Sequence, residues 1–454
     1  MFYKRSDLKV KLKRLKIESL HNLYNYEINF FDNVNILFGK NGCGKTTILN
    51  IINYIISGRL YKLRQYDFKL IELEFFNIKT EKIIIYKKEE NLILEYNGEK
   101  TVCRKFENFD ERHFLDPNKQ RDVYFKKYKL LNEIRNVFNI VYLPLSREFE
   151  DYENIDRRLL ITRYENDEIS YLDKALEKAQ NLVKEEFARL NIKVEEYEKE
   201  LKSEIFEVMF ADIDIKFKEV EFSEKIEKEI LDYLKKFNFY NLNLEEKMIE
   251  FFKKSKKLRE KYNDLQQEYK SLEANDDPTR YDEMLKVFDE ILDVQSELIL
   301  YSAISNQVYC LKEKFEEYND KINNVMLPIR QFSNIVNNFF RHSSIPKEIF
   351  VSYDKIYLKM DGQDKKIEIS DLSSGEKQII TFIAHFIFKV LPAEQPIFIV
   401  DEPEMSLHLV WQKNWISSIE ELDNNIQLII ATHSPEIVAD YRNNMIKIEP
   451  KIEG

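Results

Sequence analysis

The sequence predicts an α/β protein in which a long helical insertion separates two lobes of strands and shorter helices. Apolar segments of strand length recur in residues 8–100 and again after residue 330. The residues between are rich in Glu and Lys and carry apolar positions at heptad spacing. The 454 residues include only 8 glycines, and four of these lie in two loops that precede helices. We expect lobe I at residues 1–155, the helical (coiled-coil hairpin) insertion at 156–330 and lobe II at 331–454.

The composition restricts the class of protein. A net charge of −11 and a pI of about 5.4 argue against a chain that coats nucleic acid indiscriminately. The longest apolar stretch, at 379–388, is too short to span a bilayer, so no membrane contact is expected. The cysteines, Cys43, Cys103 and Cys310, are far apart and form neither a disulfide framework nor a metal site. A reducing cytoplasm is therefore the expected location.

Lobe I should consist mainly of strands. Its segments of strand length lie at 24–30, 34–38, 68–76, 82–86, 92–96 and 139–148. After residue 330 strand character returns at 348–360, 365–369, 396–402 and 428–434, with helices between the later segments. Since both lobes contribute strands, the insertion is expected to interrupt a single α/β domain.

The insertion should contain a helical hairpin. Five apolar residues recur at alternating steps of four and three: Leu258, Tyr262, Leu265, Tyr269 and Leu272. A second series with this spacing runs from Ile304 to Val325. Between the two series lies a turn cluster with Pro278, at residues 273–279. We expect one arm at about 245–272 and a return arm from about 281, each arm reaching roughly 40 Å.

The first glycine-rich loop, GKNGCGKTT at 39–47, follows an apolar strand and precedes an apolar helix. That context is what a Walker A loop requires. Its backbone N–H groups would surround the β-phosphate of ATP, with Lys45 at the β- and γ-phosphates and the Thr46 hydroxyl on Mg²⁺. The candidate ATP-binding residues of this loop are Gly39, Asn41, Gly42, Cys43, Gly44, Lys45, Thr46 and Thr47.

The segment PIFIVDEPE, at 396–404, is typical of a buried parallel strand that carries carboxylates at its C-terminal end. Asp401 would hold Mg²⁺, directly or through water, and Glu402 would polarise the attacking water. The alternative is a core strand followed by a solvated acidic turn.

The second glycine loop, LSSGEKQ, begins at Leu372 and precedes an apolar helix that reaches about Val390. Ser373, Ser374 and Gly375 could bind a γ-phosphate at the positive end of that helix. The alternative is an ordinary Ser N-cap, with Glu376 completing a capping box.

These motifs, in this order and followed by ATHSPE, resemble those of the ABC-type ATPases of the SMC, Rad50 and RecF kind. The resemblance implies that Ser373 and Gly375 contact the ATP of a second subunit, so that a homodimer or a larger homo-oligomer encloses ATP. It also implies that His433 senses the γ-phosphate and that residues 404–408 form the D-loop. Arg147 and Gln120 are further residues that the resemblance would assign to the site, and no Q-loop is assigned.

The motifs also look like those of the ATPase subunits of two-gene anti-phage systems such as PARIS (AriA) and Septu (PtuA), relatives of the OLD nucleases. The resemblance implies a sensor or scaffold that holds and releases a separate effector nuclease of TOPRIM or HNH type. No CxxC zinc hook stands at the hairpin turn, unlike in Rad50. The residues after Asp401 are too few for the nuclease domain of OLD proteins, so a nuclease is expected on another chain.

A dense basic stretch lies on the first arm of the hairpin. Its members are Lys253, Lys254, Lys256, Lys257, Arg259 and Lys261. This patch is a candidate site for a phage-encoded trigger or for nucleic acid. The alternative is a solvated helix face balanced by neighbouring glutamates.

Two other functions remain open at this point. The first is a DNA-repair clamp of the RecF and SMC class, which should bind duplex DNA in an ATP-dependent manner. The second is a scaffold in which ATP is bound as a structural element with negligible turnover. Both share ATP and Mg²⁺ as the expected cofactors.

Overall fold

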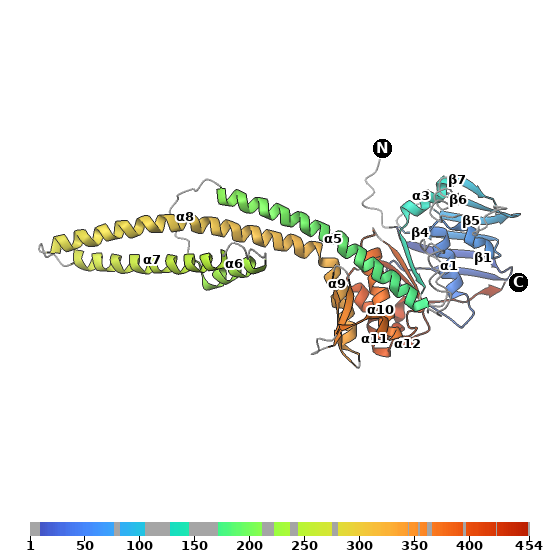
Figure 1. Cartoon of the computed structure of the whole chain (residues 1–454). Coiled ribbons are helices and arrows are strands. Elements are labelled where there is room, and N and C mark those ends of the chain that lie inside the picture. The colour runs from blue at the N-terminus through green and yellow to red at the C-terminus, as the bar shows by residue number, and fades with distance from the viewer. Residues whose placement is uncertain are drawn as a thin grey trace, which may run out of the picture. The chain divides into compact units, whose positions relative to one another are not determined.

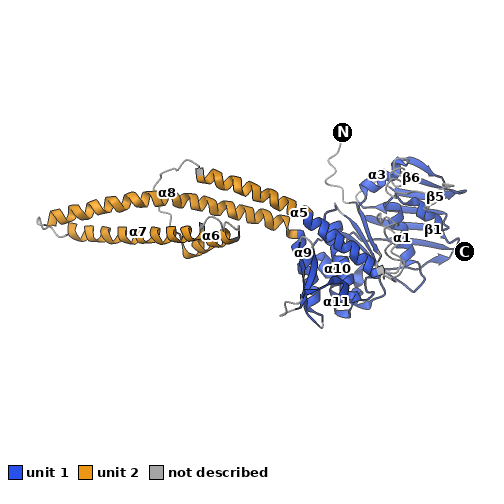
Figure 2. Cartoon of the chain, viewed as in Figure 1, with its two compact units in different colours: residues 1–188, 328–454 blue, residues 189–327 orange. Residues whose placement is uncertain are grey.

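The computed structural model describes two compact units (Figure 2). One comprises residues 1–188 with 328–454, and the other comprises residues 189–327. The residues described within them are 10–76, 82–104, 128–144, 171–210, 222–236, 244–274, 280–343, 345–352, 355–360, 366–393, 396–423 and 425–452.

The first unit contains a seven-stranded antiparallel sheet (Figure 1). In spatial order its strands are β15 (Lys451–Ile452), β2 (Tyr24–Asn29), β1 (Leu12–Leu20), β4 (Leu70–Phe75), β5 (Lys82–Lys88), β6 (Asn91–Tyr96) and β7 (Glu99–Cys103). In β4 and β6 buried side chains alternate with partly exposed ones, which is the pattern of a sheet with one face on the core. The predicted strands of lobe I in this region are therefore confirmed.

A second, five-stranded sheet is entirely parallel. Its order is β14 (Met445–Lys447), β3 (Val34–Phe38), β13 (Gln427–Ala431), β12 (Ile397–Asp401) and β8 (Ile140–Pro144). Every residue of β12 and β13 is buried, as expected for central parallel strands. Because β3, β12 and β13 are parallel, their carboxyl ends meet at one edge of the sheet, where the Walker A loop begins, Asp401 ends β12 and the ATHSPE segment follows β13.

Shorter elements complete this unit. A three-stranded antiparallel sheet has the order β11 (Lys366–Ile367), β10 (Ile356–Met360) and β9 (Lys347–Val351). The helices are α1 (Lys45–Ile56), α3 (Lys129–Val137), α9 (Leu327–Arg341), α10 (Ser374–His385), α11 (Leu409–Glu420) and α12 (Pro435–Val438), and a π-helical turn, Phe386–Val390, extends α10.

A buried side chain joins the two large sheets. The Gln427 amide nitrogen donates to the carbonyl of Leu12, and its amide oxygen accepts from the Leu12 N–H, both at 2.7 Å. Leu12 belongs to lobe I and Gln427 to lobe II, so the two lobes form one α/β domain. The predicted fold class, an α/β head interrupted by helices, is confirmed.

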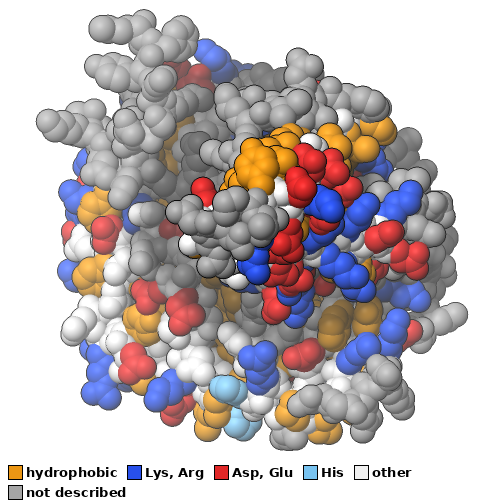
Figure 3. Space-filling model, turned by 90° about the vertical axis from the view of Figure 1, so that its left-hand side faces the viewer, with side chains coloured by type: hydrophobic (Ala, Val, Ile, Leu, Met, Phe, Trp, Pro, Cys, Tyr) orange, Lys and Arg blue, Asp and Glu red, His pale blue; other side chains and the backbone are white. Residues whose placement is uncertain are grey.

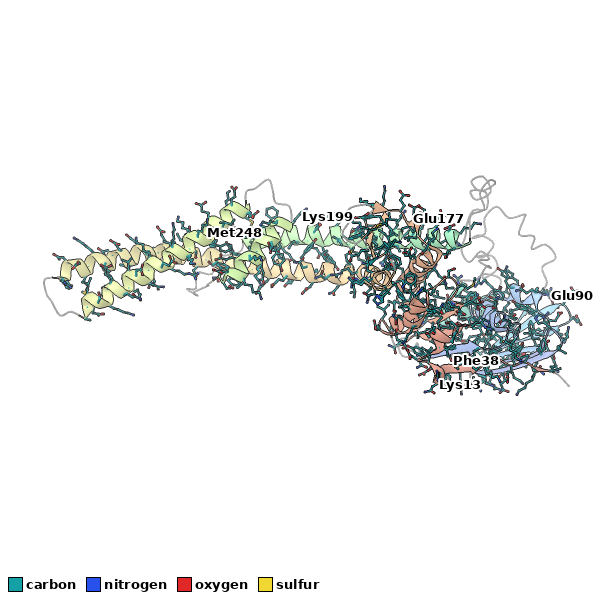
Figure 4. The ribbon with its side chains drawn as sticks, turned by 90° about the horizontal axis from the view of Figure 1, so that it is seen from below. Lys13, Phe38, Glu90, Glu177, Lys199 and Met248 are labelled. Carbon is teal, nitrogen blue, oxygen red and sulfur yellow. The ribbon has the colours of Figure 1, made fainter. Side chains whose placement is uncertain are left out.

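The second unit is helical, with α6 (Glu224–Lys236), α7 (Leu244–Glu273) and α8 (Tyr281–Val325). The predicted hairpin is confirmed, because α7 packs along α8 through a buried cluster that includes Leu265, Val287, Ile291, Val294 and Leu298. The turn at 275–279 lies outside the described residues. Figure 4 marks α7 at Met248.

The second heptad series of α8 has different partners. Phe315 and Tyr318 pack with Leu201 of α5 (Tyr171–Phe210), and Val308 packs with Ile230 of α6 and Phe252 of α7. At 45 residues α8 is longer than α7, at 30 residues, so its later turns are free to contact α5 and α6. The first half of α5 belongs to the first unit, with Ala175, Ala179 and Val183 buried there.

Candidate nucleotide-binding and hydrolysis site

The loop between β3 and α1 has the backbone of a phosphate cradle. Phe38 ends β3 (Figure 4), and Gly42 and Gly44 have φ of 79° and 92°, a region that favours glycine. A Cβ on Gly39 would lie 2.9 Å from the carbonyl oxygen of Ile448, which leaves no room for a side chain. Asn41 and Gly42 are exposed, and no side chain caps α1. The first N–H groups of the helix are therefore available to an anion.

Lys45 lies over this loop. Its side-chain ammonium donates to the carbonyl of Gly39 at 3.1 Å, and the residue is 6% exposed. Thr46 and Thr47 follow in the first turn of α1 and are partly buried. The ammonium is thus held within the loop in which the sequence places the β- and γ-phosphates.

Tyr26, on β2, supports the same loop and was missed in the sequence. Its buried hydroxyl donates to the carbonyl of Cys43 at 3.2 Å, and a Cβ on Gly44 would lie 2.9 Å from that hydroxyl. Burial raises the pKa of Tyr26 to about 12, so the hydroxyl keeps its proton at physiological pH. The sequence near Tyr26 gives no sign of this contact, because Tyr26 belongs to the seven-stranded sheet and the loop follows a strand of the parallel sheet.

Asp401 ends β12 in a fully buried position. It is 1% exposed, and neither carboxylate oxygen accepts a hydrogen bond from the described residues. Burial, together with repulsion from the Glu402 and Glu404 carboxylates, raises the pKa of Asp401 to about 6, although the neighbouring Thr46 hydroxyl and Lys45 ammonium act to lower it. A buried carboxylate without partners costs free energy unless something coordinates it. Mg²⁺ prefers such oxygens, so Asp401 and the Thr46 hydroxyl fit a magnesium site.

Glu402 and His433 lie at the same edge of the sheet. The Glu402 carboxylate is 3.8 Å from the Nε2 of His433, and the two side chains are 32% and 39% exposed. Glu402 has a φ of 51°, and its N–H donates to the carbonyl of Ala431 at 2.8 Å. A left-handed non-glycine residue costs on the order of 1 kcal/mol, a strain seen often at functional sites. The chain turns sharply here, directly after the buried aspartate.

Glu404 links the segments that follow β12 and β13, and it was not predicted as a site residue. Its carboxylate accepts from the Thr432 hydroxyl at 2.7 Å and from the His433 N–H at 2.5 Å. The predicted D-loop, 404–408, therefore begins with a side chain that fixes the backbone at His433. Gln412 extends the contact, because its amide accepts from the Ser434 hydroxyl at 2.6 Å and donates to the Leu407 carbonyl at 2.8 Å.

The second glycine loop forms the N-terminus of α10. Ser373 is the N-cap and forms a capping box with Glu376, so the ordinary capping interpretation describes the local geometry. Ser373 and Ser374 are nevertheless exposed. A Cβ on Gly375 would lie 2.5 Å from the carbonyl oxygen of Ser406, in the predicted D-loop. Among the described residues, no hydrogen bond or ion pair joins these three residues to the Walker A loop.

The predicted site residues thus form two groups. The structure brings the Walker A loop, Asp401, Glu402 and His433 together at the carboxyl edge of the parallel sheet. The second glycine loop, Ser373, Ser374 and Gly375, is called the signature loop below; its Gly375 lies against the D-loop residue Ser406. Arg147 and Gln120 are outside the described residues.

The family of the chain follows from a match over most of its length. A model of the AAA ATPase domain covers residues 11–438. The chain belongs to this ATPase family. The retron Ec83 probable ATPase of Escherichia coli is 34% identical over 90 residues, which cover 18% of this chain and 16% of that protein. Septu protein PtuA of Bacillus thuringiensis is 32% identical over 95 residues, which cover 19% and 24%.

These relatives match only in part. The aligned residues span less than a quarter of the length of either relative. Among solved structures, an Smc head domain with an extended coiled coil, bound to the C-terminal domain of ScpA and derived from Pyrococcus furiosus, is 14% identical. The alignment covers 98% of this chain and 96% of that one, with a TM-score of 0.39. The family model shows an ATPase, and the chain is similar in part to a probable retron ATPase and to a Septu protein.

The basic stretch of α7 is exposed. Its five lysines face solvent, Arg259 is partly buried, and the Lys254 ammonium lies 5.7 Å from the centre of the Tyr301 ring. None of the five lysines forms an ion pair with a residue that the structure describes. Figure 3 shows basic, acidic and hydrophobic side chains intermixed on the face turned to the viewer.

No helix in the described part of the chain combines the length and the apolar character needed to cross a membrane.

Proposed function

We propose that this ATPase binds Mg-ATP at the carboxyl edge of the parallel sheet and hydrolyses it. The observation that carries the proposal is Asp401, buried, without a hydrogen-bond partner among the described residues and adjacent to Lys45 and Thr46. Asp401 and Thr46 would hold Mg²⁺, which neutralises charge on the phosphates. Glu402 would orient and deprotonate the attacking water, and His433 would contact the γ-phosphate.

We further propose that each site is completed by a second copy of the chain. Ser373 and Ser374 are exposed, Gly375 is buried beside Ser406, and no hydrogen bond or ion pair joins the three to the Walker A loop in the described part of their own chain. A signature loop that contributes to ATP binding across a dimer needs that exposure. The partner would therefore be a second copy, in a homodimer or a larger homo-oligomer.

Mixing two inactive variants tests the shared site. A Lys45→Ala chain and a Ser373→Arg chain should each be inactive alone, and their mixture should regain ATP hydrolysis. Each mixed dimer then holds one intact site, made from the unmutated halves. Steady-state phosphate release is measured on mixed dimers purified through two different affinity tags. Recovery supports the shared site, and no recovery in such dimers argues that each chain acts alone or that both sites must be intact.

The proposed biological role is that of a sensor or scaffold in anti-phage defence, which holds a separate effector nuclease and releases it on infection. The support is the similarity to a retron ATPase and to Septu protein PtuA. Co-purification with the product of an adjacent nuclease gene, and its loss on infection, tests this role. ATP-dependent binding of duplex DNA without any such partner would instead favour the repair-clamp function.

The basic stretch of α7 is the proposed trigger site. Changing Lys253, Lys254, Lys256 and Lys257 to Glu should abolish the response to phage while ATP hydrolysis and assembly persist. If the ligand is DNA, log Kd should rise with log salt concentration, with a slope of about 0.9 for each phosphate contact, and this slope should fall in the variant. Plaque assays and filter binding over a range of salt concentrations measure the two effects.

A matched control changes four exposed lysines of α5 and α6 to Glu, namely Lys193, Lys199, Lys202 and Lys228. This variant carries the same change in net charge on the same helical unit. An equal loss of response in both variants would mean that net charge alone is responsible. A normal response in the α7 variant would mean that the stretch is only a solvated face.

A further inference from the structure

The signature serine is held by an acid in its own helix. The Ser373 hydroxyl donates to a carboxylate oxygen of Glu376 at 2.8 Å, and the Ser373 N–H donates to the same oxygen at 2.9 Å. Glu376 is 4% exposed. An acid in the first turn stabilises a helix, but it also places a negative charge beside a loop expected to bind phosphate.

Lys347 supplies the opposite charge. Its ammonium lies 2.7 Å from the other carboxylate oxygen of Glu376, and the two side chains are only 14% and 6% exposed. Lys347 is the first residue of β9, far from the signature in sequence. Burial acts to raise the pKa of Glu376, but the hydrogen bonds from Lys347 and Ser373 outweigh it and leave the pKa below its usual value. The Glu376 carboxylate is therefore ionised, its charge is balanced by Lys347, and it accepts hydrogen bonds from Ser373.

We propose that Lys347 is a positioning residue of the signature loop, which pairs with Glu376 so that Ser373 is correctly placed to meet the phosphate of a second subunit's ATP. The inference rests on the shared ATP site proposed above. Without Lys347, the buried carboxylate would either keep a negative charge beside the incoming phosphate or leave its place and release Ser373. Both results weaken phosphate binding at the signature. Neither affects the Walker A loop of the same chain.

Lys347→Met tests the proposal, because it removes the charge and keeps an unbranched apolar side chain. We expect ATP-driven dimerisation and turnover to fall about tenfold or more, as when one partner of a buried charge pair is removed. Affinity for ATP, measured on the monomer at low protein concentration, should stay as in the wild type. Lys347→Arg should restore most of the lost dimerisation, since it returns a cation.

A control and a double mutant separate this role from a loss of folding. Lys355→Met removes an exposed lysine beside the same small sheet and should behave as the wild type. Glu376→Gln should also lower dimerisation, and Lys347→Met added to it should lower it no further if Lys347 acts through Glu376. Thermal unfolding shows whether each variant folds. If Lys347→Met does not fold, Lys347→Gln is used in its place.

Two results would overturn the inference. One is normal dimerisation and turnover in a folded Lys347→Met protein. The other is a loss of monomer ATP affinity as large as in Lys45→Ala, which would indicate a general structural role. A Ser373→Arg protein that dimerises and hydrolyses ATP normally would instead refute the shared site itself, so the two failures are distinguishable.

Discussion

A Glu402→Gln protein is expected to bind Mg-ATP with the affinity of the wild type and to hydrolyse it about 10²–10⁴-fold more slowly. Gln is nearly isosteric with Glu but cannot accept a proton from water. The carboxylate faces the site from the sharp turn after Asp401 and lies 3.8 Å from His433, so its removal should leave the phosphate cradle intact. Since ATP then persists, the ATP-bound dimer should accumulate.

Lys45→Ala is the matching control, because it removes the charge at the β- and γ-phosphates and should abolish ATP binding. Equilibrium binding of a fluorescent ATP analogue, phosphate release and size-exclusion chromatography distinguish the two variants. Wild-type turnover in Glu402→Gln would refute its role as the base. Negligible turnover in the wild type, with ATP still bound and required for assembly, would favour the structural scaffold.

Local patterns predicted the parts of the fold that depend on neighbouring residues. The segment from Val34 to Ile56 shows this. Its apolar strand, its glycine-rich turn and its apolar helix were each predicted from the sequence and are found as β3, the loop and α1. The fully buried β12 was predicted from its continuous apolar run. The hairpin of α7 and α8 followed from heptads and a proline in the turn.

Contacts between distant segments could not be predicted in this way. Heptad spacing shows that α8 has an apolar seam, but not that its later turns pack on α5 rather than α7. In the sequence Tyr26 belongs to an ordinary predicted strand, and Lys347 lies just before another. They acquire their roles because strand order places them beside the Walker A loop and the signature helix. Glu404 lies three residues after β12, and the resemblance placed it in the D-loop without giving it a role of its own.

Gly375→Ala is expected to lower ATP-driven dimerisation and turnover by about 10²-fold, because a misplacement of about 1 Å in a catalytic group can have that effect. The added Cβ would lie 2.5 Å from the carbonyl oxygen of Ser406 and 3.4 Å from the Trp411 ring. The first contact is with backbone, which cannot rotate away, so α10 and the D-loop must separate. ATP binding to the monomer should be unchanged, since the Walker A loop is not touched.

Gly98→Ala serves as the control for Gly375→Ala. Its Cβ would meet nothing within 4 Å, but Gly98 has a φ of 75°, so the change strains the backbone by about 1–2 kcal/mol without a clash. It should lower the melting temperature and leave turnover per folded molecule unchanged. Analytical ultracentrifugation with and without ATP, together with phosphate release, compares the two variants. Normal dimerisation in a folded Gly375→Ala protein would mean that the D-loop yields to the methyl group, and that the close contact between α10 and Ser406 is not required for the shared site.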